Sequence, residues 1–305
     1  MLAPIVLFVY NRVDHVVKTL TALSQNDLAP ESELIIYSDG PKASKDEEAV
    51  LQVRSFVKSF KEKDCFKSLT IVEAEKNKGL ANSIISGVTE IISKYEKIIV
   101  IEDDCITSND FIEYMNNALD HYADNKKIWS IGGFTVDLNF PSDYAYDTYI
   151  MGRTCSYAWG TWIDRWNLVD WNVSDYRKFK YNLRARAKFN KYGNDRSKML
   201  DLQQCKKTNS WAIRFCYAMY KNDMYTVYPC YSKVKNIGYD IGTHNSGKET
   251  RFNVKIKEQK ITRFVDEVVV DERLRKQYIK YFKMSFIKRF LAYILNVLLP
   301  QKRRS

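Results

Sequence analysis

The first hundred residues alternate between short apolar runs and longer segments in which apolar side chains recur every three or four positions. Short apolar runs rich in β-branched residues predict buried strands, and the helical spacing predicts amphipathic helices. The predicted strands are Pro4–Tyr10, Glu33–Tyr37, Leu69–Val72 and Lys97–Ile101. The predicted helices are His15–Leu23, Asp46–Phe60 and one that opens at Asn77-Lys78-Gly79 and runs to about Tyr95. Apolar strands separated by helices indicate a parallel sheet covered on both faces.

After Asp104 the pattern is less regular. It still predicts helices at Phe111–His121 and Trp211–Lys221, a basic helical stretch at Lys178–Lys207, and strands at Ile128–Ile131 and Val227–Tyr231. Residues 133–175 are rich in Tyr, Trp, Asp and Gly, and Lys235–Gly247 predicts a loop. We therefore expect one α/β domain made of two halves, residues 1–125 and 126–250, followed by a tail at 251–305.

Polar clusters follow the predicted strands at the points where they end. They are Asn11-Arg12, Asp39, Asn77 and Glu102-Asp103-Asp104. In open parallel sheets, ligands bind in the crevice beyond the carboxyl ends of the strands. Each cluster alone is equally typical of a solvated turn, Asp39-Gly40 above all, but their joint placement favours a binding site.

The acidic triplet Glu102-Asp103-Asp104 has two interpretations. Mg²⁺ and Mn²⁺ bind through one or two protein carboxylates and complete their coordination with water and phosphate oxygens. An acidic turn that enters a helix would have the same sequence. If phosphate binds here, it binds through a metal and scattered cations, because the chain has neither a G-x-x-x-x-G-K-[ST] loop nor a G-x-G-x-x-G fingerprint.

The charge of +11 is unevenly distributed. Residues 1–250 contribute a net +1, residues 251–305 a net +10, and no acidic residue follows Glu272. This distribution argues against a nucleic-acid groove across the body, so no nucleic acid is expected as a partner. Six Cys without a C-x-x-C pair, three His and no secretory signal predict reduced thiols in a cytoplasmic protein.

The tail carries an amphipathic pattern over Tyr278–Leu299, with apolar residues on one stripe and Lys and Arg mostly off it. This pattern is typical of a helix that lies on anionic lipid. A helix packed on the domain, or a dimer contact, is the alternative. On the lipid interpretation, residues 273–305 bind the inner face of the cell membrane, and their deletion would release the protein from it.

Four of the six Trp lie between Trp159 and Trp171. Trp rings stack on the apolar faces of sugars, so the stretch is a candidate sugar site, although core packing explains each Trp equally well. His244, in a Gly-rich loop, is either a metal or phosphate contact or a loop residue without a ligand.

The order of these segments resembles nucleotide-sugar-dependent glycosyltransferases of the GT-A fold, in particular the N-acetylglucosaminyltransferase family of complex N-glycan synthesis and bacterial polysaccharide glycosyltransferases. The resemblance covers roughly residues 4–245. It rests on PIVLFVYNR (4–12), IIYSDG (35–40), IVIEDDCITSNDFIEY (99–114), WSIGGF (129–134), Arg153, WGTWIDRW (159–166), SWAIR (210–214) and NIGYDIGTH (236–244).

The resemblance implies a Rossmann-like, mixed but mainly parallel sheet flanked by helices, with the donor in residues 1–125 and the acceptor in 126–250. It implies Mn²⁺ or Mg²⁺ on Asp104, with His244 as a further candidate ligand. The implied contacts to the nucleotide sugar are Asn11, Arg12, Asp39, Asn77, Gly79, Glu102 and Asp103. The implied acceptor contacts are Arg153, Trp159, Gly160 and Trp211.

One position departs from the family. Its members place a carboxylate, the general base, beside the Trp of the SWAIR-like motif, where this chain has Asn209. An amide cannot accept a proton from a sugar hydroxyl at neutral pH, so Asp240, and after it Asp164, is the expected catalytic base.

These features predict a metal-dependent glycosyltransferase of hexosyl or N-acetylhexosaminyl type. It would move a sugar from a nucleoside-diphosphate sugar, expected to be UDP-linked, to a glycan or lipid-linked acceptor in surface polysaccharide synthesis, with inversion. The alternative is a catalytically silent carbohydrate-binding or scaffold protein at the membrane surface, which Asn209 favours.

Overall fold

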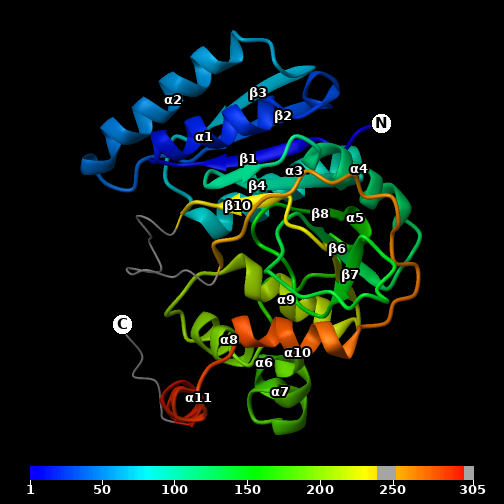
Figure 1. Cartoon of the computed structure of the whole chain (residues 1–305). Coiled ribbons are helices and arrows are strands. Elements are labelled where there is room, and N and C mark those ends of the chain that lie inside the picture. The colour runs from blue at the N-terminus through cyan, green and yellow to red at the C-terminus, as the bar shows by residue number, and fades with distance from the viewer. Residues whose placement is uncertain (239–251, 299–305) are drawn as a thin grey trace.

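In a computed structural model of the chain, residues 1–238 and 252–298 are described. Their centre is an eight-stranded sheet with the strand order β3-β2-β1-β4-β8-β6-β9-β7 (Figure 1). Strands β3, β2, β1 and β4 are mutually parallel, β6 and β9 are parallel to each other, and the pairings of β8 and β7 are antiparallel. The sheet is therefore mixed and mainly parallel, and helices flank it, which confirms the predicted fold class.

The first half follows the apolar pattern closely. Its strands are β1 (Ile5–Val9), β2 (Glu33–Ser38), β3 (Ser68–Glu73) and β4 (Lys97–Glu102). Its helices are α1 (Val13–Ser24), α2 (Glu47–Lys61) and α3 (Leu80–Tyr95). Every residue of β1 is buried, as expected of a central parallel strand with a helix on each face.

The second half adds α4 (Phe111–His121), α9 (Trp211–Lys221), β6 (Ile128–Gly132) and β9 (Tyr225–Pro229), all near their predicted places. A separate two-stranded ribbon joins β5 (Cys105–Thr107) to β10 (Val234–Asn236). In Figure 1, β10 lies beside β4. This ribbon brings residues near 236 to the end of β4.

Like β5 and β10, two strands of the main sheet were not predicted. They are β7 (Thr148–Met151) and β8 (Trp159–Trp162), which lie within the aromatic region. β8 runs antiparallel between β4 and β6, with Gly160 opposite Ile99 and Ile131. A Cβ on Gly160 would lie 3.0 Å from the carbonyl oxygen of Ile98. The sequence WGTW thus forms a buried strand of the sheet, followed by α5 (Ile163–Trp166).

The basic stretch Lys178–Lys207 is not one helix. It contains α6 (Tyr176–Lys180), α7 (Leu183–Phe189) and α8 (Arg196–Gln204). The side chain of Asn182 caps α7, and Gly193 separates α7 from α8 with a φ of +136°. These helices lie below the sheet with α9 and α10 (Figure 1). The conformation of Gly193 is one that other residues rarely adopt, which explains the break.

The predicted helix over Tyr278–Leu299 is interrupted. Helix α10 (Glu272–Tyr281) ends inside this range, and α11 (Phe286–Tyr293) begins after a short connection and continues as a π-helical turn at Ile294–Leu298. Tyr278 is 3% exposed and donates a hydrogen bond to the hydroxyl of Tyr228. The prediction that residues 273–305 form a detachable membrane segment is therefore wrong for α10, which is part of the core.

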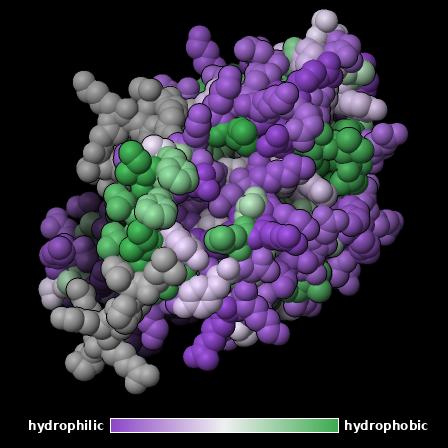
Figure 2. Space-filling model, turned by 90° about the horizontal axis from the view of Figure 1, so that it is seen from below, coloured by the Kyte–Doolittle hydropathy of each residue, from purple (hydrophilic) through white to green (hydrophobic). Residues whose placement is uncertain are grey.

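Helix α11 differs from α10. Ala292, Asn296 and Val297 are buried, and Asn296 accepts a hydrogen bond from Lys207. Its large apolar residues face outward, between 51% and 74% exposed: Phe286, Ile287, Phe290, Leu291 and Leu295. Figure 2 shows these side chains gathered on the underside of the molecule. We call these five residues the α11 apolar face.

No helix among the described residues is both long and apolar enough to cross a bilayer. All six cysteines are free thiols.

Candidate active site

The carboxyl ends of β1, β2 and β4 meet at one edge of the sheet. Val9 pairs with Ser38 on one side, and Phe8 pairs with Glu102 on the other. The residues that come after these ends therefore lie together, as expected of parallel strands. Of the polar clusters predicted there, the structure brings Arg12 to the acidic triplet, and Asp39 to the loop that contains Asn77.

Arg12 joins the carboxylates of Asp103 and Asp104. Its guanidinium forms an ion pair with Asp103, with one further hydrogen bond of 3.2 Å, and lies 3.0 Å from Asp104. Both carboxylates are buried, at 5% and 9% residue exposure. Burial lowers the pKa of Arg12, but the two carboxylates outweigh this effect and raise it. Arg12 is thus the cation that holds this pair in place.

The second half of the chain completes the surroundings of Asp104. Asn236 donates a hydrogen bond of 2.9 Å to the carboxylate, and the amide of Ile237 donates one of 2.8 Å to the backbone carbonyl of Asp104. Gly238 lies so close that a Cβ there would overlap the Asp104 carboxylate. These contacts were not predicted individually. The only sequence signal for them was the NIGYDIGTH segment of the resemblance.

The acidic triplet carries more negative charge than Arg12 neutralises. Burial raises the pKa of Glu102 to about 8, the charges of Asp104 and Asp103 add to this rise, and Arg12 and a hydrogen bond with Trp211 oppose it. Burial also raises the pKa of Asp103 to about 6, despite the ion pair with Arg12. Such crowding of buried carboxylates is costly unless a cation is present.

These donors suit Mn²⁺ or Mg²⁺. The oxygens are hard ligands, and such ions need only one or two carboxylates when phosphate supplies the remaining positions. Within residues 1–238 and 252–298, no group of three or more His, Cys, Asp or Glu side chains is arranged to hold a metal by itself. His244, the second candidate ligand, lies outside the described residues.

Asp39 organises a loop. One carboxylate oxygen accepts hydrogen bonds from the amides of Gly40 and Lys78, each 2.9 Å long, and the other accepts from the Gly79 amide at 2.9 Å and the Asn77 side chain at 3.2 Å. These bonds fix the loop that precedes α3. Asp39, Asn77 and Gly79 stay predicted contacts of the nucleotide, with Asp39 acting through the loop that it holds.

Replacing Asp39 by Ala is expected to lower the free energy of unfolding by about 2–4 kcal/mol, because the buried amide of Gly40 and three partly buried donors lose a charged acceptor. Asp39→Asn keeps one acceptor oxygen, so its free energy of unfolding should fall by less. Urea denaturation of both variants measures the difference. A loss below about 0.5 kcal/mol for Asp39→Ala, typical of an exposed position, would contradict this role.

The predicted acceptor residues divide into two groups. Trp159 is fully buried and stacked between Trp166 and Trp211, and Gly160 is buried inside the sheet. The prediction that these two contact the acceptor is wrong, because neither is accessible. Trp211 is also largely buried, but its hydrogen bond with Glu102 places it against the acidic triplet.

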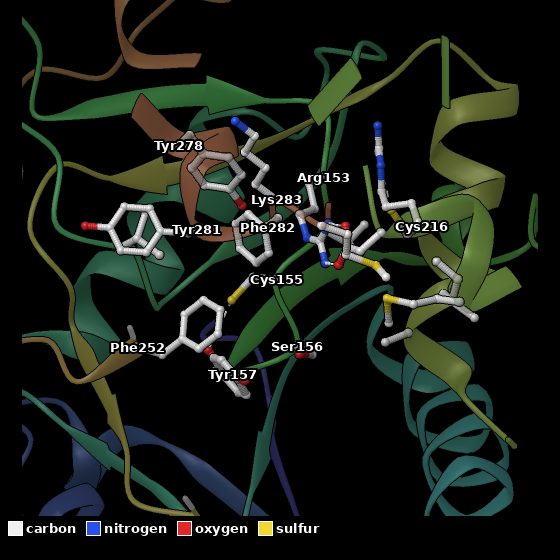
Figure 3. Close-up of a pocket in the computed structure, with 18 of the residues that line it drawn as sticks. Arg153, Cys155, Ser156, Tyr157, Cys216, Phe252, Tyr278, Tyr281, Phe282 and Lys283 are labelled. Atoms are coloured by element: carbon white, nitrogen blue, oxygen red, sulfur yellow. Dashed lines mark hydrogen bonds and ion pairs between the residues drawn. The ribbon is translucent and has the colours of Figure 1, made fainter. Parts of the chain in front are cut away.

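Arg153 lines a cavity. Its guanidinium lies 3.9 Å from the ring centre of Phe282 and forms two hydrogen bonds, of 2.8 and 2.9 Å, with Asp195. Figure 3 shows Arg153 close to Phe282 inside this cavity, which has a volume of about 900 Å³. Ala212 and Ile213, which come directly after Trp211, also line the cavity. No residue of the acidic triplet lines the cavity, but its lining residue Cys155 is close enough for the charge of Glu102 to contribute to the raised pKa of the thiol, behind the larger effect of burial.

Of the two predicted catalytic bases, Asp164 and Asp240, the structure describes only Asp164. Asp164 comes after β8, whose Trp162 pairs with Lys97 at the start of β4, so Asp164 lies at the sheet edge opposite Glu102. It is held there by Lys126 and Arg165. The assignment of Asp164 as base is therefore wrong. Asp240 lies outside the described residues and stays a prediction.

Asn209 is exposed, and its side-chain oxygen accepts a hydrogen bond of 3.0 Å from Arg214. Asn11 is half-buried beside Arg12. No contact within the described part of the chain ties either side chain to the acidic triplet, so their functional assignments rest on position along the chain alone.

No protein-family model and no curated protein matches the sequence. Three similar solved structures are glycosyltransferases. A mannosyltransferase from Pyrobaculum calidifontis in complex with GDP-Man and Mn²⁺ is 14% identical, with a TM-score of 0.38 over 53% of this chain and 44% of that one. Residues 1–349 of S. aureus TarS are 12% identical, with a TM-score of 0.44 over 75% of this chain and 60% of that one. The complex of TarS with UDP-GlcNAc is 13% identical, with a TM-score of 0.35 over 48% and 38%.

The chain spans less than two thirds of each of these neighbours. At this level of similarity, a functional assignment has to come from the residues of the chain itself.

Proposed function

We propose that this protein transfers a sugar from a nucleoside-diphosphate sugar to a hydroxyl of a glycan or lipid-linked acceptor, and that it requires Mn²⁺ or Mg²⁺. The observation that carries the proposal is the acidic triplet at the carboxyl edge of the parallel strands. There, buried carboxylates exceed the positive charge of Arg12, and a cavity of about 900 Å³ lies near them.

Asp104 would hold the divalent cation, since its carboxylate lies among contacts from both halves of the chain. When bound, the cation neutralises negative charge that develops on the departing diphosphate. Arg12 aligns Asp103 and Asp104 and would also contact the phosphates of a bound donor. Glu102, held by its hydrogen bond with Trp211, would orient the transferred sugar.

Asp240 is the proposed general base that removes the proton of the acceptor hydroxyl, a contribution of about 10²–10⁴-fold to the rate. Direct attack by that hydroxyl on the anomeric carbon would invert its configuration. The α11 apolar face, beside Lys288 and Arg289, would rest on an anionic membrane and so bring the site to a lipid-linked acceptor.

A thermal-shift screen tests the proposal. UDP-GlcNAc, other UDP-sugars and GDP-mannose are each added with Mn²⁺ and with EDTA. We expect stabilisation only when the correct donor and Mn²⁺ are both present, by about 2.7 kcal/mol at a donor concentration one hundred times its Kd.

Slow release of nucleoside diphosphate in the stabilised sample would support an enzyme, because water can replace the acceptor. Stabilisation with no turnover, even when acceptor is present, would favour the silent carbohydrate-binding protein. No metal-dependent shift with any donor would contradict both.

A further inference from the structure

The cavity near the acidic triplet is strongly basic. Five basic residues and one acidic residue line it, a net charge of +4: Arg153, Arg196, Lys198, Lys283, Lys288 and Asp195. Asp195 is already bound to Arg153 through two hydrogen bonds. Among the residues that the structure describes, the other four basic groups have no carboxylate partner. The cavity thus has positive charge available for an anionic ligand.

Arg196 is the most unusual of these groups. It is 1% exposed, and its guanidinium donates hydrogen bonds to the backbone carbonyl of Gly152 and to the sulfur of Cys216. Its Nε is buried and has no hydrogen-bond partner among the described residues. A buried charge without a carboxylate is costly, and an anion in the cavity would reduce that cost.

The walls of the cavity are aromatic. Figure 3 shows the rings of Tyr278, Tyr281, Phe282, Phe252 and Tyr157 on one side of it, with Cys155 between them and Arg153. Aromatic faces pack well against the C–H faces of sugars. The cavity therefore combines surfaces that suit a sugar with charges that suit a phosphate.

The cavity also continues toward the α11 apolar face. Lys283, Met284, Ser285 and Lys288 line it at the start of α11. The neighbouring residues Phe286 and Ile287 are 74% and 68% exposed. An anionic group held by these lysines would thus lie next to a surface that suits an acyl or polyprenyl chain.

We propose that this cavity binds the phosphate of a lipid-linked sugar acceptor, with Lys198, Lys283, Lys288 and Arg196 around the phosphate and the lipid chain along the α11 apolar face. The sugar of the acceptor would then lie against the aromatic wall, on the side of the acidic triplet. This inference rests on the proposed function for the reaction, but the binding site itself can be tested separately.

The test uses dodecyl phosphate below its micellar concentration, added to the full chain in EDTA, so that no metal-dependent donor site contributes. Binding is followed by isothermal titration. The double variant Lys283→Gln/Lys288→Gln should bind at least about tenfold more weakly, because it removes two of the four basic groups that have no carboxylate partner among the described residues. Lys276→Gln/Lys280→Gln, with the same loss of charge on exposed positions of α10 outside the cavity, should remain within about twofold of the parent.

Two further probes identify the ligand class. Dodecanol lacks the phosphate and should bind weakly, and inorganic phosphate lacks the chain and should also bind weakly. Inorganic phosphate that binds as tightly as dodecyl phosphate would overturn the lipid assignment. Equal losses of affinity for dodecyl phosphate in the two double variants would overturn the cavity assignment. So would the absence of dodecyl phosphate binding to the parent.

Donor binding separates this inference from the proposed function. The stabilisation by nucleotide sugar and Mn²⁺ should be the same in Lys283→Gln/Lys288→Gln as in the parent. If no donor binds and dodecyl phosphate still depends on Lys283 and Lys288, the cavity assignment holds and only the proposed reaction is overturned.

Discussion

Asp104→Asn is expected to remove the Mn²⁺-dependent stabilisation by nucleotide sugar and to lower sugar transfer by about 10²–10³-fold or more. The amide has nearly the shape of the carboxylate but lacks its charge. The carboxylate lies between Arg12, at 3.0 Å, and Asn236, at 2.9 Å, so it is positioned by both halves of the chain. The measurements are the thermal midpoint with Mn²⁺ and donor, and the release of nucleoside diphosphate.

Asp164→Asn is the matched control. The same chemical change is made at the opposite edge of the sheet, on a partly exposed carboxylate paired with Lys126 and Arg165. Activity should remain within about twofold of the parent, as for a surface substitution away from the site. Loss of activity in Asp164→Asn, or full Mn²⁺-dependent stabilisation of Asp104→Asn, would contradict the proposal that Asp104 holds the cation. Circular dichroism of both variants verifies that the fold is kept.

Truncation of the tail before α10 is expected to prevent stable folding, whereas truncation before α11 is expected to leave the protein folded. A chain that ends at Asp271 loses α10 and every residue after it, including Leu274 and Tyr278, which are 0% and 3% exposed, and Phe282 beneath Arg153. Loss of large buried side chains costs about 2–5 kcal/mol each. Together they approach the whole stability of a typical domain, about 5–15 kcal/mol, so this chain should not fold stably.

A chain that ends at Ser285 loses only α11 and the residues C-terminal to it. It keeps Tyr278 and Phe282, so it should still fold, with a thermal midpoint lowered only by the loss of the buried contacts of Ala292, Asn296 and Val297. It should no longer float with phosphatidylglycerol vesicles, which the full chain should bind more strongly than phosphatidylcholine vesicles. Thermal unfolding and flotation are the measurements. A stable chain ending at Asp271, or continued flotation of the chain ending at Ser285, would contradict the respective role of α10 or α11.

The limits of sequence interpretation are clearest in the aromatic region. WGTW offered conspicuous rings and a flexible Gly, both typical of a sugar site, yet Trp159 is fully buried and Gly160 lies across from Ile99 in the sheet. A strand of four residues has too little alternation to distinguish it from a loop. The rings of Tyr278 and Phe282, which do line the cavity, are far away in the sequence and belong to a segment that was interpreted as a membrane anchor.

The sequence by itself determined the parallel half of the sheet and the edge at which Arg12 and the acidic triplet meet. Apolar runs and helical spacing are local signals, and the ends of parallel strands necessarily share an edge. Only the tertiary structure decided which carboxylates touch Arg12, that Asn236 reaches Asp104 and that Asp164 lies at the other edge. It also decided that α10 packs in the core while the apolar face of α11 is exposed. These outcomes depend on pairings between residues more than ninety positions apart or on antiparallel neighbours such as β8, and no local pattern specifies them.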